Sequence, residues 1–245
     1  MADLKTTDVF FSINSFMEEE LRNKTVVVID VLRASSTIVT ALLNGASAVI
    51  PVADMGEASK IAQNVDSDNY LLCGEKDGIK IEGYHLGNSP LEYTRELVEG
   101  KKLIFNTTNG TKAIKKTFNS SRICIGSFLN VSAVAEMLKE QSNEIVLICA
   151  GWKGRLALED MLCAGNILYH LFGDELGKSS RDGVRISHSL YKSYGAQLKE
   201  LIHQSNHAER LKEQAGPEDI DYCCQIDTTD VVPCLHEGMI TLANG

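Results

Sequence analysis

The amino-acid sequence predicts an α/β protein built on a mainly parallel sheet. Short apolar runs rich in β-branched residues alternate with amphipathic segments of helical length, the pattern of repeated strand–helix units. The first run is continuously apolar, which indicates a strand buried on both faces. Several runs end in polar loops that lead into a helix start. The expected strands lie at 26–29, 48–52, 70–73, 103–105, 122–127 and 144–149.

The first unit organises the rest of the chain. A valine-rich strand ends at Asp30, so its carboxylate is expected at the carboxyl edge of the sheet, where open α/β proteins bind ligands. Ser35 or Ser36 is expected to cap the following helix, and Gly45 to end it. Arg33 lies between strand and cap, a fixed positive charge suited to phosphate or carboxylate. The unit predicts an anion and metal site.

Polar loops follow the next strands. An expected helix at 55–63 and the strand at 70–73 lead into the long loop GEKDGIKIEGYHLGNSPLEY, which contains Glu75, Lys76 and Asn88. Long polar loops in compact domains are usually functional or mobile. A helix at 91–99 is expected to follow.

The strand at 103–105 runs into NTTNGTKAI, where a glycine stands at a helix start. Glycine lets backbone amides converge on an anion, and the helix dipole favours negative charge there. Hydroxyl residues beside one glycine also make ordinary turns, so both interpretations stay open. The strand at 122–127 ends in GSFLN, before a helix expected at 132–139. The candidate binding residues of these two loops are Thr107, Thr108, Asn109, Gly110, Thr111 and Ser127.

The strand at 144–149 leads through the loop GWKGR into a helix expected at 156–171. Lys153 and Arg155 of this loop are candidates for binding anions. Under an offset of 120 residues, Arg33 corresponds to Lys153 and Gly45 to Gly165, which suggests an internal duplication. Two similar α/β halves are therefore predicted, residues 1–118 and residues 119–245. The helical tail beyond residue 181 is expected to cover the sheets and cross between the halves.

Four acids are candidates for a metal site. Glu159 and Asp160 lie in the first turn of a predicted helix, where the helix dipole alone favours acids. If the strand ends converge, these two meet Asp30 and Glu75 as a set of oxygen ligands. Carboxylates together with water suit Mg²⁺, which accepts few protein ligands, so ligation by all four at once is not expected.

Composition and charge argue against nucleic-acid binders, membrane proteins and secreted proteins. The formal charge of −9 without a basic stripe argues against a nucleic-acid binder. No apolar run has membrane-spanning length, and the first ten residues do not form a signal peptide. Seven cysteines without paired metal spacings predict reduced thiols in a cytoplasm, with Cys223 and Cys224 serving packing. A homodimer is expected from general prevalence.

Other phosphate chemistries leave partial signals. Cys149 and Arg155 have the C-x5-R spacing of cysteine-dependent phosphatases, although Ile148 stands where a His would precede the cysteine. Leu32 occupies the place of the second Asp that haloacid-dehalogenase-type phosphatases need. His203 and His207 are spaced i, i+4 without the Glu of a zinc helix, which favours a surface or packing role.

Taken together, the segments IDVLRASST, CGEKDG, GNSPLE, NTTNGTKA, IGSFLN and CAGWKGRLALEDMLCAG resemble the 2-phosphosulfolactate phosphatase family of coenzyme M biosynthesis, and the tail SNHAERLK…EDIDYC…VVP is similar to that family as well. The resemblance spans nearly the whole chain. It implies two Rossmann-like three-layer α/β/α halves, with possible exchange of C-terminal elements. It also implies Mg²⁺-dependent hydrolysis of 2-phospho-3-sulfolactate to 3-sulfolactate and phosphate.

The residues fit that assignment, because a small molecule carrying phosphate, carboxylate and sulfonate needs several cationic and amide groups. Asp30, Arg33 and Glu159 are the expected catalytic residues. Mg²⁺ is expected on Asp30 and one or more of Glu75, Glu159 and Asp160. A cysteine phosphatase and a non-catalytic binder of small organic anions remain alternatives. The expected substrate-binding residues are Arg33, Ser35, Ser36, Lys76, Asn88, Thr107, Thr108, Asn109, Gly110, Thr111, Ser127, Lys153 and Arg155.

Overall fold

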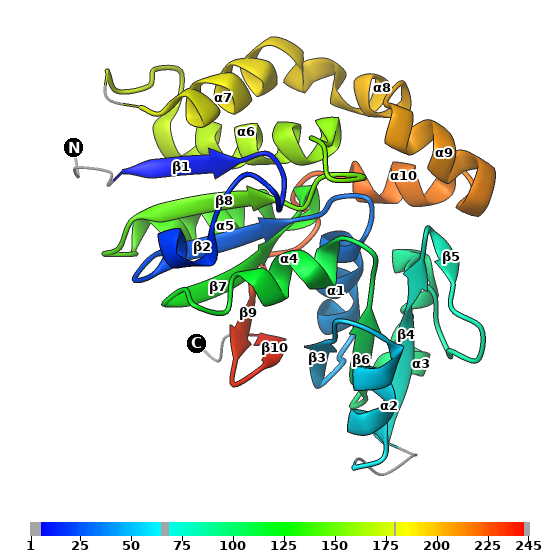
Figure 1. Ribbon diagram of the computed structural model, residues 1–245. Coiled ribbons are helices and arrows are strands. Elements are labelled where there is room, and N and C mark those ends of the chain that lie inside the picture. The colour runs from blue at the N-terminus through cyan, green and yellow to red at the C-terminus, as the bar shows by residue number, and fades with distance from the viewer. Residues whose placement is uncertain (1–5, 65–68, 179, 243–245) are drawn as a thin grey trace.

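The computed structural model describes residues 6–64, 69–178 and 180–242, and it confirms the α/β class. Within these residues ten strands form one mixed sheet in the order β1-β8-β2-β7-β9-β10-β3-β6-β4-β5, with helices packed against it (Figure 1). The sheet consists of two parallel blocks joined by an antiparallel hairpin.

The first block holds four parallel strands, which are β1 (Thr7–Phe10), β8 (Ile145–Cys149), β2 (Thr25–Ile29) and β7 (Arg122–Gly126). All five residues of β2 are buried, as the continuous apolar run predicts. Val27 and Ile29 join one apolar cluster with α6, whereas Val26 and Val28 join another with α1. Helices therefore cover both faces of β2, which lies in the interior of the block.

The second block holds the parallel strands β3 (Ala48–Pro51), β6 (Lys102–Asn106) and β4 (Tyr70–Lys76), and β5 (Ile79–Lys80) pairs antiparallel with β4. A hairpin of β9 (Pro233–His236) and β10 (Met239–Leu242) closes the gap between the blocks, since β9 pairs with β7 and β10 with β3. The C-terminal strands thus lie in the middle of the sheet.

Cys124 of β7 and Cys234 of β9 form a disulfide, so the expectation that all cysteines are reduced is wrong for these two. They stand opposite each other in the antiparallel register, which brings their side chains to the same face. Cys223 and Cys224 are buried free thiols, as predicted.

The helices up to α6 lie between strands in chain order, and α7 to α10 follow α6 with no strand between them. They are α1 (Ala34–Leu43), α2 (Met55–Ala62), α3 (Arg95–Val98), α4 (Gly110–Lys116), α5 (Val131–Lys139), α6 (Leu158–Phe172), α7 (Asp182–Tyr194), α8 (Leu198–His203), α9 (Asn206–Ala215) and α10 (Glu218–Cys223). Short 3-10 helices are η1 (Glu18–Leu21), η3 (Pro90–Glu92), η4 (Phe128–Asn130) and η5 (Gly195–Gln197). In the described part of the chain no helix combines the length and the apolar character needed to cross a membrane.

One predicted helix is broken. The segment predicted as one helix at 91–99 forms η3 and α3, separated at Tyr93. The Tyr93 ring is fully buried, and its hydroxyl donates to the Gly87 carbonyl at 2.7 Å, so side-chain burial fixes the backbone there. The division at residue 118 stays a prediction; in the sheet, β2 lies between β7 and β8.

Candidate functional site

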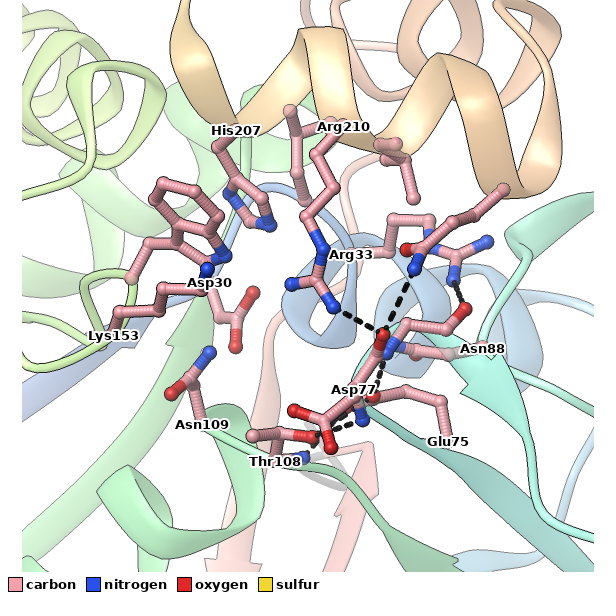
Figure 2. A pocket seen from close by; sticks show the side chains of 15 residues that line it. Asp30, Arg33, Glu75, Asp77, Asn88, Thr108, Asn109, Lys153, His207 and Arg210 are labelled. Carbon is pink, nitrogen blue, oxygen red and sulfur yellow. Dashed lines mark hydrogen bonds between the residues drawn. The ribbon is translucent and has the colours of Figure 1, made fainter.

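A cavity of about 570 Å³, including its open mouth, lies at the carboxyl ends of β2, β4, β6 and β8 (Figure 2). Helix α9 contributes one wall from the C-terminal part of the chain. Strand-end loops and helix together supply its lining: Asp30, Leu32, Arg33, Glu75, Asp77, Gly78, Asn88, Thr108, Asn109, Trp152, Lys153, His207, Arg210, Leu211 and Gln214. Seven predicted site residues therefore meet here, namely Asp30, Arg33, Glu75, Asn88, Thr108, Asn109 and Lys153.

Asp30 stands where β2 ends. Its backbone amide donates to Ser35 Oγ at 2.8 Å, and the Ser35 amide donates to the Asp30 carbonyl at 2.8 Å. The Ser36 hydroxyl donates to the Val31 carbonyl at 2.9 Å. Helix α1 begins at Ala34, so neither serine caps it, and the predicted cap is wrong. Both serines lie in the first turn and hold the backbone of the strand end.

The Asp30 carboxyl group is held in an unfavourable environment for charge. The pKa of this carboxyl group is raised from 3.8 to about 7, mainly by burial and in smaller part by the nearby carboxylates of Glu75 and Glu159. His207 and the Ala34 backbone amide act in the opposite direction. A cation bound beside Asp30 would relieve this cost, so the carboxylate is suited to metal binding.

Gly110 explains how the 106–111 turn approaches Asp30. A Cβ atom at this position would lie 2.7 Å from Asp30 Oδ2 and 2.4 Å from the Ala34 side chain. Only glycine allows α4 to begin this close to the acid.

The donors of this turn bind protein groups. The Thr107 amide donates to Thr111 Oγ1 and the Thr111 amide to Thr107 Oγ1, at 3.1 and 3.0 Å. The Thr108 amide and hydroxyl both donate to the carboxylate of Glu75, at 2.6 and 2.9 Å. The turn thus holds Glu75 in place, and its Thr108 and Asn109 side chains line the cavity.

Arg33 is buried and paired. Its guanidinium forms an ion pair with Asp219 of α10, and it donates to the Gly78 carbonyl at 3.1 Å. The Ser89 hydroxyl donates to the other oxygen of Asp219. Arg33 therefore joins the β4–β5 turn to α10, and Asp219 neutralises its charge.

Glu159 and Asp160 lie behind the cavity wall. Asp160 accepts the amides of Val31 and Gly151, at 2.9 and 3.1 Å, and so ties together the loops after β2 and β8. Burial raises its pKa well above the ordinary value, with Glu159 and Asp30 adding to the rise. Glu159 Oε1 lies 2.6 Å from His207 Nδ1, and its Oε2 is buried without a hydrogen-bond partner in the described part of the chain.

Sequence reasoning missed the contribution of α9. His207, Arg210 and Gln214 line the cavity, and His207 stacks on Trp152 with ring centroids 5.2 Å apart. A surface or packing role was predicted for His207, whereas the structure places this residue in the cavity wall. The available signal was the i, i+3, i+7 spacing of these three residues, which places them on one face of a helix.

The other predicted residues lie outside this cavity. Lys76 and Thr107 line a neighbouring cavity, on whose border Glu75 and Thr108 also lie. Ser35, Ser36, Gly110 and Thr111 are buried beside the strand ends. Ser127 is buried at the start of η4, where its amide donates to Asn130 Oδ1 at 2.9 Å. Arg155 is exposed.

The residues present fit a magnesium ion only with fewer protein ligands than the four acids considered from the sequence. Among the residues the structure describes, no group of three or more His, Cys, Asp or Glu side chains is arranged to hold a metal ion. Both oxygens of Asp160 accept amides, and Glu75 accepts three hydrogen bonds. Among the residues that the structure describes, Asp30 alone offers the cavity a buried carboxylate without a side-chain partner. Mg²⁺ is often bound by one or two carboxylates together with substrate phosphate oxygens and water, and Asp30 satisfies that requirement.

Cys149 is unsuited to nucleophilic attack. It is fully buried in β8, it does not line the cavity, and burial raises its pKa well above the ordinary value, with Asp160 adding to the rise. A thiol in this state is not a nucleophile, because the thiolate is the reactive form.

We expect Cys149→Ser to keep any hydrolysis of phosphate monoesters within about threefold of the wild-type value, provided the fold is intact, because this side chain is buried outside the cavity and does not reach a ligand there. Steady-state kinetics with circular dichroism as the folding control measure this. Loss of activity in a folded variant would restore the cysteine route.

Sequence comparison identifies the family. The family model described as 2-phosphosulpholactate phosphatase matches residues 11–238. A protein of Caldanaerobacter subterraneus subsp. tengcongensis named probable 2-phosphosulfolactate phosphatase is 43% identical over 97% of this chain and 97% of its own length. A protein with the same name from Pseudothermotoga lettingae is 45% identical over 86% of this chain and 89% of its own length. Another from Clostridium tetani is 40% identical over 95% of this chain and 98% of its own length. The chain, whose strand-end cavity holds Asp30 among cationic side chains, belongs to the 2-phosphosulpholactate phosphatase family.

Proposed function

We propose that the protein hydrolyses 2-phospho-3-sulfolactate to 3-sulfolactate and phosphate with the help of Mg²⁺. The observation that carries the proposal is the buried carboxylate of Asp30, which shares one strand-end cavity with Lys153 and Arg210. A site with both signs of charge suits a phosphate monoester that is bound with a cation. The names of the relatives supply the particular ester.

Electrostatic stabilisation must supply most of the rate enhancement. Hydrolysis of phosphate monoesters is among the slowest uncatalysed reactions, and charge develops on the phosphoryl oxygens and the leaving oxygen. Lys153 and Arg210 attract and hold the polyanion, which a chain of net charge −9 would otherwise repel.

The acids orient the site. Asp30 would hold Mg²⁺, which when bound would neutralise charge on a phosphoryl oxygen and favour attack by water. Glu159 orients His207 through the 2.6 Å contact to Nδ1, so that the imidazole keeps one position at the cavity wall. Asp160 fixes the loops that carry Asp30 and Lys153.

Phosphate release from 2-phospho-3-sulfolactate, measured with Mg²⁺ and with EDTA, tests the proposal. We expect turnover with Mg²⁺ and its loss in EDTA, restored by added Mg²⁺. Full activity in EDTA would contradict the metal dependence. Binding of the ester without any phosphate release would favour a non-catalytic anion binder.

A cytoplasmic location and a homodimer stay predictions. Sedimentation of the purified protein measures the oligomeric state, and a monomer at micromolar concentration would contradict the homodimer.

A further inference from the structure

The cations of the cavity differ in how they are neutralised. Arg33 is paired with Asp219, and both side chains are at most 5% exposed. Lys153 and Arg210 lie within 4 Å of no carboxylate in the part of the chain that the structure describes. Two cavity cations are therefore available to a ligand, and only one of them, Arg210, can form two parallel hydrogen bonds to one acid group.

Trp152 positions both cations. The Lys153 Nζ atom lies 4.6 Å from the centroid of the indole ring, and the Arg210 Cζ atom lies 5.9 Å from it. The ring is itself stacked on His207, with an interplanar angle of 18°. Cation–π attraction holds such side chains beside the ring without neutralising their charge.

Arg210 has a second anchor on the opposite side of the cavity. Its Nη2 donates to the Asp77 carbonyl at 2.6 Å, and Gln214 Nε2 donates to the same oxygen at 3.2 Å. Figure 2 shows Arg210 reaching from α9 toward Asp77, with Lys153 across the cavity. A guanidinium has five N–H donors, so this contact fixes its direction and leaves donors for a ligand.

We propose that Arg210 binds the acid group of the substrate that is not transferred, a carboxylate or a sulfonate, and thereby selects phosphate monoesters that carry a second acid. The inference rests on the proposed function and adds to it the residue that recognises the second acid group of the substrate. Trp152 and the Asp77 carbonyl orient the guanidinium before the ligand arrives, which lowers the entropic cost of binding. Helix α9 therefore supplies specificity, while Asp30 serves the reacting phosphoryl group.

The test is Arg210→Met, which keeps an unbranched apolar stem and removes the guanidinium with its charge and donors. Arg95→Met is the matched control, because Arg95 is exposed, does not line the cavity, and forms an ion pair with Glu99 four residues along the chain. Both variants are compared with four phosphate monoesters: the proposed substrate, its analogue without sulfonate, its analogue without carboxylate, and a monoester without a second acid.

We expect Arg210→Met to lower kcat/KM by about 10- to 100-fold for esters that carry the recognised acid and by less than about threefold for the ester without one. The analogue that escapes the loss identifies which acid Arg210 binds. An equal loss for all four esters, or no loss for any, would overturn the proposal.

Calorimetry separates this inference from the proposed function. Arg210→Met is expected to weaken binding of 3-sulfolactate at least tenfold and binding of inorganic phosphate by less than about threefold, whether or not the protein turns over any ester. If the wild-type protein binds phosphate and does not bind 3-sulfolactate, the assignment of Arg210 is wrong.

Discussion

Asp30→Asn is expected to lower kcat/KM by about a hundred- to a thousandfold and to make the metal-free protein more stable at pH 8. The loss of activity follows because Asp30, within the described residues, is the one buried carboxylate that faces the cavity without a side-chain partner. Removing a preorganised electrostatic partner of a transition state costs about that much. The gain in stability follows from the cost of ionising Asp30, whose pKa is raised to about 7 by burial.

The sign of the pH dependence follows from the raised pKa. Between about pH 4 and pH 7 the folded protein keeps the proton of Asp30 while the unfolded chain has lost it, so the free energy of unfolding falls as pH rises through this window. The stability that the folded protein gains by keeping this proton is fully present below about pH 4 and is lost above about pH 7. An amide cannot ionise, so Asp30→Asn should remove this part of the pH dependence and raise stability at pH 8 by on the order of 1–4 kcal/mol.

Urea unfolding in EDTA at pH 5 and pH 8 measures this effect, and Asp230→Asn, an exposed aspartate outside the cavity, is the control. Added Mg²⁺ should raise the melting temperature of the wild-type protein at pH 8 and leave that of Asp30→Asn unchanged. If Asp30→Asn were less stable than the wild-type protein at pH 8, the claim that ionising Asp30 costs folding free energy would be contradicted. Equal stabilisation of both proteins by Mg²⁺ would contradict the assignment of Asp30 as the metal ligand.

Asp219→Asn is expected to lower the free energy of unfolding by on the order of 3–5 kcal/mol, because it leaves a buried arginine without its charged partner. Asp219 and Arg33 are 3% and 5% exposed, and Asp219 accepts hydrogen bonds from both Arg33 and Ser89. The pair joins α10 to the loop after β2, so its loss should also loosen one wall of the cavity.

Urea unfolding again gives the measurement, with unchanged m-values as the condition for comparison. The double variant Arg33→Met with Asp219→Asn should recover part of the lost stability, since it removes the unpaired charge. A cost below about 1 kcal/mol for Asp219→Asn, typical of an exposed pair, would show that the two groups are solvated.

Local sequence patterns were sufficient to predict which residues lie at the carboxyl ends of the strands. The apolar run before Asp30 predicted a buried strand, and the rule that parallel strands present their carboxyl ends to ligands placed Asp30, Thr108 and Lys153 in one cavity. The turn around Gly110 was also predicted, although its amides bind Glu75 and its own hydroxyls. The cap was misassigned because a serine one residue inside a helix resembles a capping serine in sequence.

The contribution of α9 needed the tertiary structure. His207 and Arg210 are polar residues on an amphipathic helix, and such a pattern does not indicate whether the polar face meets solvent or a cavity. The same holds for Arg33, whose pairing with Asp219 depends on two segments that are 186 residues apart in the chain.

The α/β class, the strand that ends at Asp30 and the family could all be predicted from the sequence, because these depend on local apolar runs and on motifs in order. The packing of distant segments decided the rest: that the C-terminal hairpin lies between two parallel blocks, that Cys124 meets Cys234, and that α9 closes the cavity. Strand partners and helix docking are set by which apolar faces fit together, and that fit is a property of the whole folded chain.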